Sequence, residues 1–79
     1  MPPSYHPTLA DLLWAESVIA TVKDGGFWIF PSTGMVFQFD HVTREVTLVN
    51  VVTRRQNEEM YNRTVIVFSY VGYTVKEAS

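Results

Sequence analysis

The sequence predicts an α+β domain in which one N-terminal helix packs on a four-stranded antiparallel sheet, in the order α-β-β-β-β. Three observations support this prediction. An apolar stripe with helical spacing lies near the N-terminus, strand-like runs separated by short turns follow it, and most of the valines come after residue 35. Consecutive strands joined by short connections pair antiparallel, because a parallel pair needs a long crossover.

The length of 79 residues fits a single domain, residues 1–79. Residues 1–7 contain three prolines and are expected to form a flexible arm. A helix is expected over residues 8–24 and the antiparallel sheet over residues 27–75. A chain this small buries one thin core, which excludes a second lobe or a deep cleft.

The start of the helix is indicated by Thr8, which is followed three residues later by Asp11, the spacing of a capping box. Gly25 and Gly26 are expected to close the helix, since glycine adopts the left-handed conformation easily. The stripe expected to face the core consists of Leu12, Ala15, Ile19 and Val22, with Val18 at its edge.

The strands are read from apolar runs and the turns between them. Runs 27–30 and 35–39 flank a Pro-Ser-Thr-Gly turn and predict a hairpin. A third strand is expected over 45–53, a polar connection over 54–63, and the last and longest strand over 64–75.

Two cross-strand pairs set the predicted register, Phe30 opposite Met35 and Asp40 opposite Glu45. The residues then expected on the core face are Trp28, Phe30, Phe37, Phe39, Val46 and Leu48. The opposite face receives Phe27, Ile29, Val36, Gln38, Thr47, Val49 and Val51, and is still largely apolar. One helix cannot cover both faces, so we expect a partner: another copy, another protein or a return of the chain. A wrapped, barrel-like sheet is the alternative.

Composition excludes several classes of chemistry. The chain has no cysteine, so it has no disulfide, thiolate nucleophile or cysteine-based metal site, and we expect no cofactor. His6 and His41 lie far apart, and no spacing supplies a catalytic triad or a metal pair, so we expect no enzyme activity. No apolar run is long enough to span a membrane and the N-terminus does not resemble a secretory signal, which predicts a cytoplasmic protein.

The leading functional hypothesis is a non-catalytic protein-binding module. Binding energy is expected from Trp14, Tyr61 and Tyr73 at the apolar rim. Acidic side chains are expected to steer the protein toward a basic partner surface: they are Glu16, Asp24, Glu58 and Glu59. A homodimer is also expected, with an interface that includes Leu9, Leu13, Val36, Thr47, Val49 and Val51.

Two alternatives remain open. A nucleic-acid-binding module would use Arg44, Arg54, Arg55 and Arg63, but the formal net charge of −2 disfavours phosphate binding. A small-ligand pocket between helix and sheet would be cramped in so thin a core.

In size and predicted architecture the chain resembles the small inhibitor proteins of phages and mobile elements, such as the anti-CRISPR proteins. The resemblance rests on no motif, so it transfers no functional residue. It implies an inhibitor that blocks a larger complex which handles nucleic acid.

Overall fold

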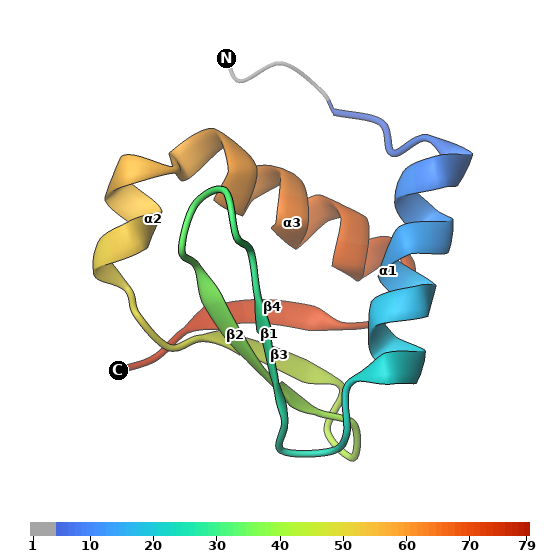
Figure 1. The fold of residues 1–79 in the computed structure, drawn as a ribbon. Helices are drawn as coiled ribbons and strands as arrows, with labels where there is room; N and C mark the ends of the chain where they lie inside the picture. The colour runs from blue at the N-terminus through green and yellow to red at the C-terminus, as the bar shows by residue number, and fades with distance from the viewer. Residues whose placement is uncertain (1–4) are drawn as a thin grey trace.

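The computed structural model describes residues 5–79, as three helices on one side of a four-stranded sheet (Figure 1). Residues 1–4, most of the predicted arm, lie outside the described residues. The strands stand in the order β1-β2-β3-β4. The elements are α1 (Leu9–Thr21), β1 (Phe27–Ile29), β2 (Val36–Asp40), β3 (Glu45–Leu48), α2 (Val52–Gln56), α3 (Glu58–Tyr70) and β4 (Thr74–Glu77).

Helix α1 begins as predicted, with Thr8 as its N-cap and a complete capping box between Thr8 and Asp11. It ends at Thr21, earlier than the predicted residue 24, because Val22 already has an extended backbone. Gly25, with a φ of +79°, lies in the turn that follows. The predicted stripe is confirmed with a shifted centre: Ala15, Val18 and Val22 are buried, while Leu12 and Ile19 are half-buried at its sides.

The first three strands follow the predicted register. The N–H of Phe30 donates to the carbonyl of Met35 at 2.9 Å, and Asp40 lies opposite Glu45. Both strand pairs, β1 with β2 and β2 with β3, are antiparallel. The predicted core face is confirmed: Phe30, Phe37, Phe39, Val46 and Leu48 are buried, and Trp28 is half-buried.

After Leu48 the prediction of further antiparallel strands is wrong. The third strand ends at Leu48 instead of residue 53. Helices α2 and α3 occupy residues 52–70, which were expected as the end of the third strand, the polar connection and part of the last strand. These helices supply a crossover, so β4 lies parallel to β3, with Val46 beside Val75. The sheet is therefore mixed, and the single predicted helix is joined by two more.

Helix α3 is rich in β-branched residues, which favour strands locally. Its buried side chains nevertheless have helical spacing, since Tyr61, Thr64 and Phe68 all face the core. The helix ends at Tyr70, and Gly72, just after the C-cap Val71, has a φ of +87°, the left-handed conformation that glycine adopts without strain. There the N–H of Gly72 donates to the Ser69 carbonyl and the N–H of Tyr73 to the Phe68 carbonyl, which is a Schellman motif.

The core lies between the sheet and the helical layer formed by α1 and α3 (Figure 1). Aromatic rings join the layers, since the centroids of Phe39 in the sheet and Phe68 in α3 are 5.7 Å apart. On the sheet side of the core, the centroids of Phe30 and Phe37 are 5.4 Å apart. We call this covered side the inner face. The opposite side, the outer face, is not covered by any segment of residues 5–79, and no such segment closes the sheet into a barrel.

Candidate interaction surface

The outer face consists of three rows of side chains that run across the strands. The first row is apolar: Ile29 lies opposite Val36, and the N–H of Val49 donates to the Val36 carbonyl at 2.8 Å. The second row is mixed and consists of Phe27, Gln38, Thr47 and Lys76. The third row is polar and consists of Asp40, Glu45 and Thr74. The face therefore has an apolar end and a polar end.

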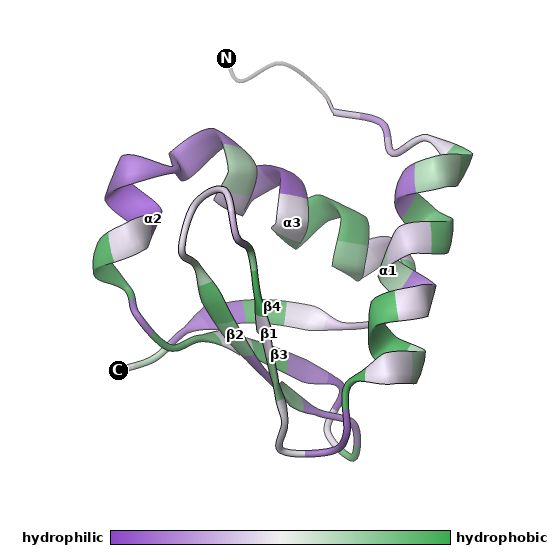
Figure 2. Ribbon diagram, viewed as in Figure 1, coloured by the Kyte–Doolittle hydropathy of each residue, from purple (hydrophilic) through white to green (hydrophobic). Residues whose placement is uncertain are grey.

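The apolar end is open to solvent. Phe27 is 55% exposed, Ile29 57% and Val49 43%, while Val36 is half-buried between its neighbours. In Figure 2, much of β1 has the colour of hydrophobic residues. Single exposed apolar residues are normal, but a contiguous row across three strands is typical of an interaction surface.

Strand β1 also forms an open edge of the sheet. In an antiparallel ladder, hydrogen-bonded and non-hydrogen-bonded pairs alternate. The N–H of Phe30 and the carbonyl of Gly26 both bond to β2. Trp28 therefore makes the intervening bonds, and the backbone N–H and C=O groups of Phe27 and Ile29 point away from β2. These two residues present both apolar side chains and free backbone groups.

The other edge, β4, is protected by charge. Lys76 pairs with Glu45 at 3.2 Å, and Glu77 pairs with Arg54 of α2. Charged side chains on an edge strand discourage pairing with another chain. By contrast, residues 25–39, which include β1, contain no charged side chain.

The polar end of the outer face is acidic. Asp24, Asp40 and Glu45 line a hollow of about 290 Å³, in which Lys76 is the one cation. Hydrogen bonding from the backbone N–H of Thr43 lowers the pKa of Asp40. The carboxylate of Asp24 accepts the backbone N–H of His41 at 2.8 Å. A negative charge therefore lies at one end of the outer face, and the mixed row separates it from the apolar row.

The three aromatic residues predicted to bind a partner have different environments. Trp14 is 38% exposed and packs edge-on against Phe30 and Phe68, with centroid distances of 5.7 Å to each. Tyr61 and Tyr73 are only 5% and 7% exposed. The expectation that they lie at the surface is wrong, because both belong to segments whose helical packing or helix-ending turn the sequence did not predict.

The predicted steering carboxylates are all exposed but do not form one patch. Glu16 lies on α1, and Glu58 and Glu59 lie in the first turn of α3, where they favourably face the positive end of the helix dipole. Of the four residues, Asp24 lines the hollow on the outer face. Asp40 and Glu45, which were not predicted, supply the other negative charge there.

The predicted dimer residues divide between two surfaces. Leu9 and Leu13 are 72% and 57% exposed on α1, in the helical layer. Val36, Thr47 and Val49 lie on the outer face, and Val51 is 36% exposed just before α2. Sequence reasoning placed Phe27 and Ile29 on this face but did not identify β1 as its open edge.

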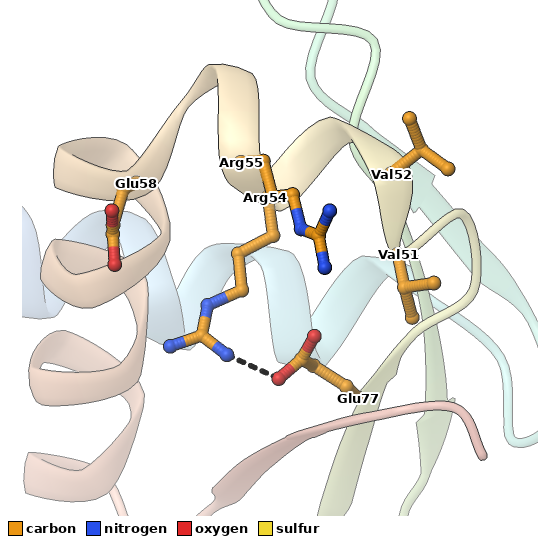
Figure 3. Close-up of a pocket in the computed structure, with 6 residues that line it drawn as sticks. All are labelled: Val51, Val52, Arg54, Arg55, Glu58 and Glu77. Atoms are coloured by element: carbon orange, nitrogen blue, oxygen red, sulfur yellow. Dashed lines mark hydrogen bonds and ion pairs between the residues drawn. The ribbon is translucent and has the colours of Figure 1, made fainter.

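The four arginines of the nucleic-acid alternative are dispersed. Arg54 and Arg55 line a hollow of about 580 Å³ beside α2, where Arg54 pairs with Glu77 (Figure 3) and lies 4.6 Å over the Tyr61 ring. Arg44 lies in the β2–β3 turn, at the other end of β3 from α2. Arg63 pairs with Asp11 at 3.0 Å. Two of these side chains thus already have internal carboxylate partners.

The N-terminal segment is fastened to the helices by Asp11. Its carboxylate accepts the hydroxyl of Tyr5 and a guanidinium N–H of Arg63, whose Nε donates to the Tyr5 oxygen at 2.9 Å. The hydrogen bond from Tyr5 is the main reason that the pKa of Asp11 falls to about 2. Beside this cluster, Trp14 and Met60 line an open groove of about 300 Å³ between α1 and α3.

Both ring nitrogens of His41 form hydrogen bonds within the protein. Its Nε2 lies 2.6 Å from the Val22 carbonyl and its Nδ1 lies 2.7 Å from the Tyr73 hydroxyl. A carbonyl only accepts, so Nε2 carries the hydrogen and Nδ1 accepts the tyrosine proton. Both ring nitrogens are therefore engaged within the protein, and His41 links the β2–β3 turn to the end of α1.

Among residues 5–79, no three His, Asp or Glu side chains are arranged to hold a metal ion. None of the helices in that same stretch combines the length and hydropathy needed to cross a bilayer. Comparison with protein families, with curated proteins and with solved structures gives no match for this chain.

Proposed function

We propose that this protein is a non-catalytic protein-binding module whose outer sheet face takes a partner protein. The observation that carries the proposal is the row of Ile29, Val36 and Val49, extended by Phe27. This row is largely exposed, although the same strands bury most of their other face. Burial of apolar area of this kind is the main driving force of protein association.

The charge of the outer face indicates the chemistry of the partner. The acidic hollow lined by Asp24, Asp40 and Glu45 adjoins the mixed row, which separates it from the apolar row, so a complementary partner has an apolar patch with Lys or Arg beyond one end of it. A protein groove that otherwise holds nucleic acid has this character. The protein would then act in the cytoplasm as an inhibitor of a larger complex, in the manner of the anti-CRISPR proteins that it resembles in format.

The nucleic-acid alternative is less well supported. A phosphate-binding surface needs clustered cations. Here the arginines lie at separate places, Arg54 and Arg63 have carboxylate partners, and the net charge is −2.

The proposal is tested by affinity capture from cells with two matched variants of the full chain. Ile29→Lys with Val49→Lys places two positive charges on the outer face. Leu13→Lys with Val42→Lys adds the same charge at two other exposed apolar residues, on α1 and on the β2–β3 turn. We expect one protein to be captured stoichiometrically by the wild type and by the second variant, and to be lost from the first.

Two outcomes contradict the proposal. In one, the partner is retained by the outer-face variant and lost from the Leu13 and Val42 variant, which moves the binding surface to the helical side. In the other, the protein binds short DNA or RNA far more tightly than the non-specific range of about 100 μM, and Arg54→Ala with Arg55→Ala abolishes this binding.

A further inference from the structure

We propose that two copies of this chain pair antiparallel through the open edge of β1, so that their sheets join into one continuous sheet. The inference builds on the proposed function, because edge pairing doubles the outer face that a partner protein meets. It commits to a second copy of this chain as the occupant of the edge.

The backbone of β1 is complementary to itself. In a pairing centred on Trp28, Phe27 of one copy lies opposite Ile29 of the second copy, and the reverse pair forms across the two-fold axis. Phe27 and Ile29 are the two residues whose N–H and C=O groups point away from β2. Each pair can therefore exchange both of its N–H···O=C bonds, as in a native antiparallel ladder.

The side chains agree with this register. On the outer face, the second copy's Phe27 continues the row of Val49, Val36 and Ile29, so the exposed apolar side chains of the two copies meet at the centre of the joined sheet. On the inner face, the half-buried Trp28 meets the second copy's Trp28. Cross-strand aromatic and aliphatic pairs are the contacts that stabilise sheets.

The charge distribution permits this contact and disfavours the competing one. No charged side chain lies between residues 25 and 39, so no charge is buried at the seam. The two-fold axis places the two acidic hollows at opposite ends of the seam. A contact of β1 with β4 would build an open filament, but β4 carries Lys76 and Glu77 at its edge. The contact therefore closes as a dimer.

One helix of the helical layer, α3, lies away from the β1 edge. Helix α3 packs against β4, the strand farthest from β1 in the sheet. Pro31 has no N–H and ends the ladder soon after β1. The short seam predicts a dimer that forms at micromolar concentration.

The test is sedimentation of the full chain at concentrations up to about 100 μM, together with amide hydrogen exchange. Ile29→Pro removes one outward N–H that the protein's own sheet does not use, as edge strands tolerate. Ile29→Lys places a charge at the seam, and Val42→Lys places the same charge on the 84% exposed Val42 of the β2–β3 turn. Val49→Lys changes the outer face away from the edge.

We expect the wild type, Val42→Lys and Val49→Lys to be dimers, and Ile29→Pro and Ile29→Lys to be folded monomers. In the wild type, protection of the Phe27 and Ile29 amides should rise with concentration, and this measurement decides the matter if the Ile29 variants do not fold.

A wild type that stays monomeric up to about 100 μM, or a dimer that survives both Ile29 substitutions, overturns the pairing. A dimer lost with Val49→Lys but kept with Ile29→Pro also overturns it, in favour of stacked outer faces. If the monomeric wild type still captures a partner through the outer face, the pairing fails and the proposed function stands. If the dimer forms as expected and no partner is captured, the proposed function fails and the pairing stands.

Discussion

The two faces of the sheet are made from the same strands and similar residues, yet one face is buried and the other is exposed to solvent. On the inner face Phe37 and Phe39 are 1% exposed, whereas on the outer face Phe27 and Ile29 are 55% and 57% exposed. The two faces differ in what lies over them: α1 and α3 cover the inner face. Strand alternation therefore assigns a residue to a face, while the packing of distant helices decides which face becomes the core.

The largest expected effect comes from matched truncations on the two faces. Phe39→Ala removes a ring that packs on Phe68 and Tyr73, and should lower the free energy of unfolding by about 3–5 kcal/mol. Phe27→Ala, on the outer face, should cost less than about 1 kcal/mol. Denaturant unfolding at low micromolar concentration measures both. Equal losses would show that the outer face contributes to the folded core of the isolated chain.

A smaller loss of stability is expected when the hydroxyl of a buried tyrosine is removed, and none when the hydroxyl of an exposed tyrosine is removed. Tyr73→Phe removes the donor to Nδ1 of His41 and should cost about 1–2 kcal/mol, since a half-buried acceptor loses its partner. Tyr70 is 59% exposed, and Tyr70→Phe is the control, with no change expected. Thermal unfolding of both variants tests this, and an unchanged melting temperature for Tyr73→Phe contradicts the assigned link between His41 and Tyr73.

The smallest effect concerns the contact of Asp11 with Tyr5 and Arg63, which joins α1 to α3 within the helical layer. The folded chain lowers the pKa of Asp11 from 3.8 to about 2, so its ionised form stabilises the protein above about pH 4. This stabilisation is lost as the pH falls through about 2. Asp11→Asn should therefore melt below the wild type at neutral pH and approach it near pH 2.

Glu16→Gln is the control on the same helix and should keep the acid dependence of the wild type. If Asp11→Asn also keeps that dependence, the cluster of Tyr5, Asp11 and Arg63 does not form in solution.

For residues 8–48, local sequence patterns predicted most of the helix and strand structure. The capping box at Thr8, the first hairpin and the pairing of Asp40 with Glu45 were all predicted, as was the apolar stripe of α1, although Val18 was expected at its edge. Each depends on contacts between residues close in the chain, where short turns leave few alternatives. The two faces of the first three strands followed from the same register.

For residues 49–77, the predicted polar connection and long strand were wrong. Val65, Ile66 and Val67 favour a strand by propensity, but the spacing of Tyr61, Thr64 and Phe68 favours a helix, and Gly72 supplies its stop. The conflict between these signals is resolved by tertiary packing, because only the helix places Phe68 against Phe39 while returning β4 to the edge of β3.

Patterns along the chain were enough to predict the α+β class, the start and buried face of α1, and the register that leaves a second apolar face on the sheet. The packing of distant elements was needed to show that β1 is an open edge, that Tyr61 and Tyr73 are buried, and that the arginines are dispersed. The physical reason is range: caps, turns and alternation act within a few residues, whereas exposure depends on which distant elements pack above a residue.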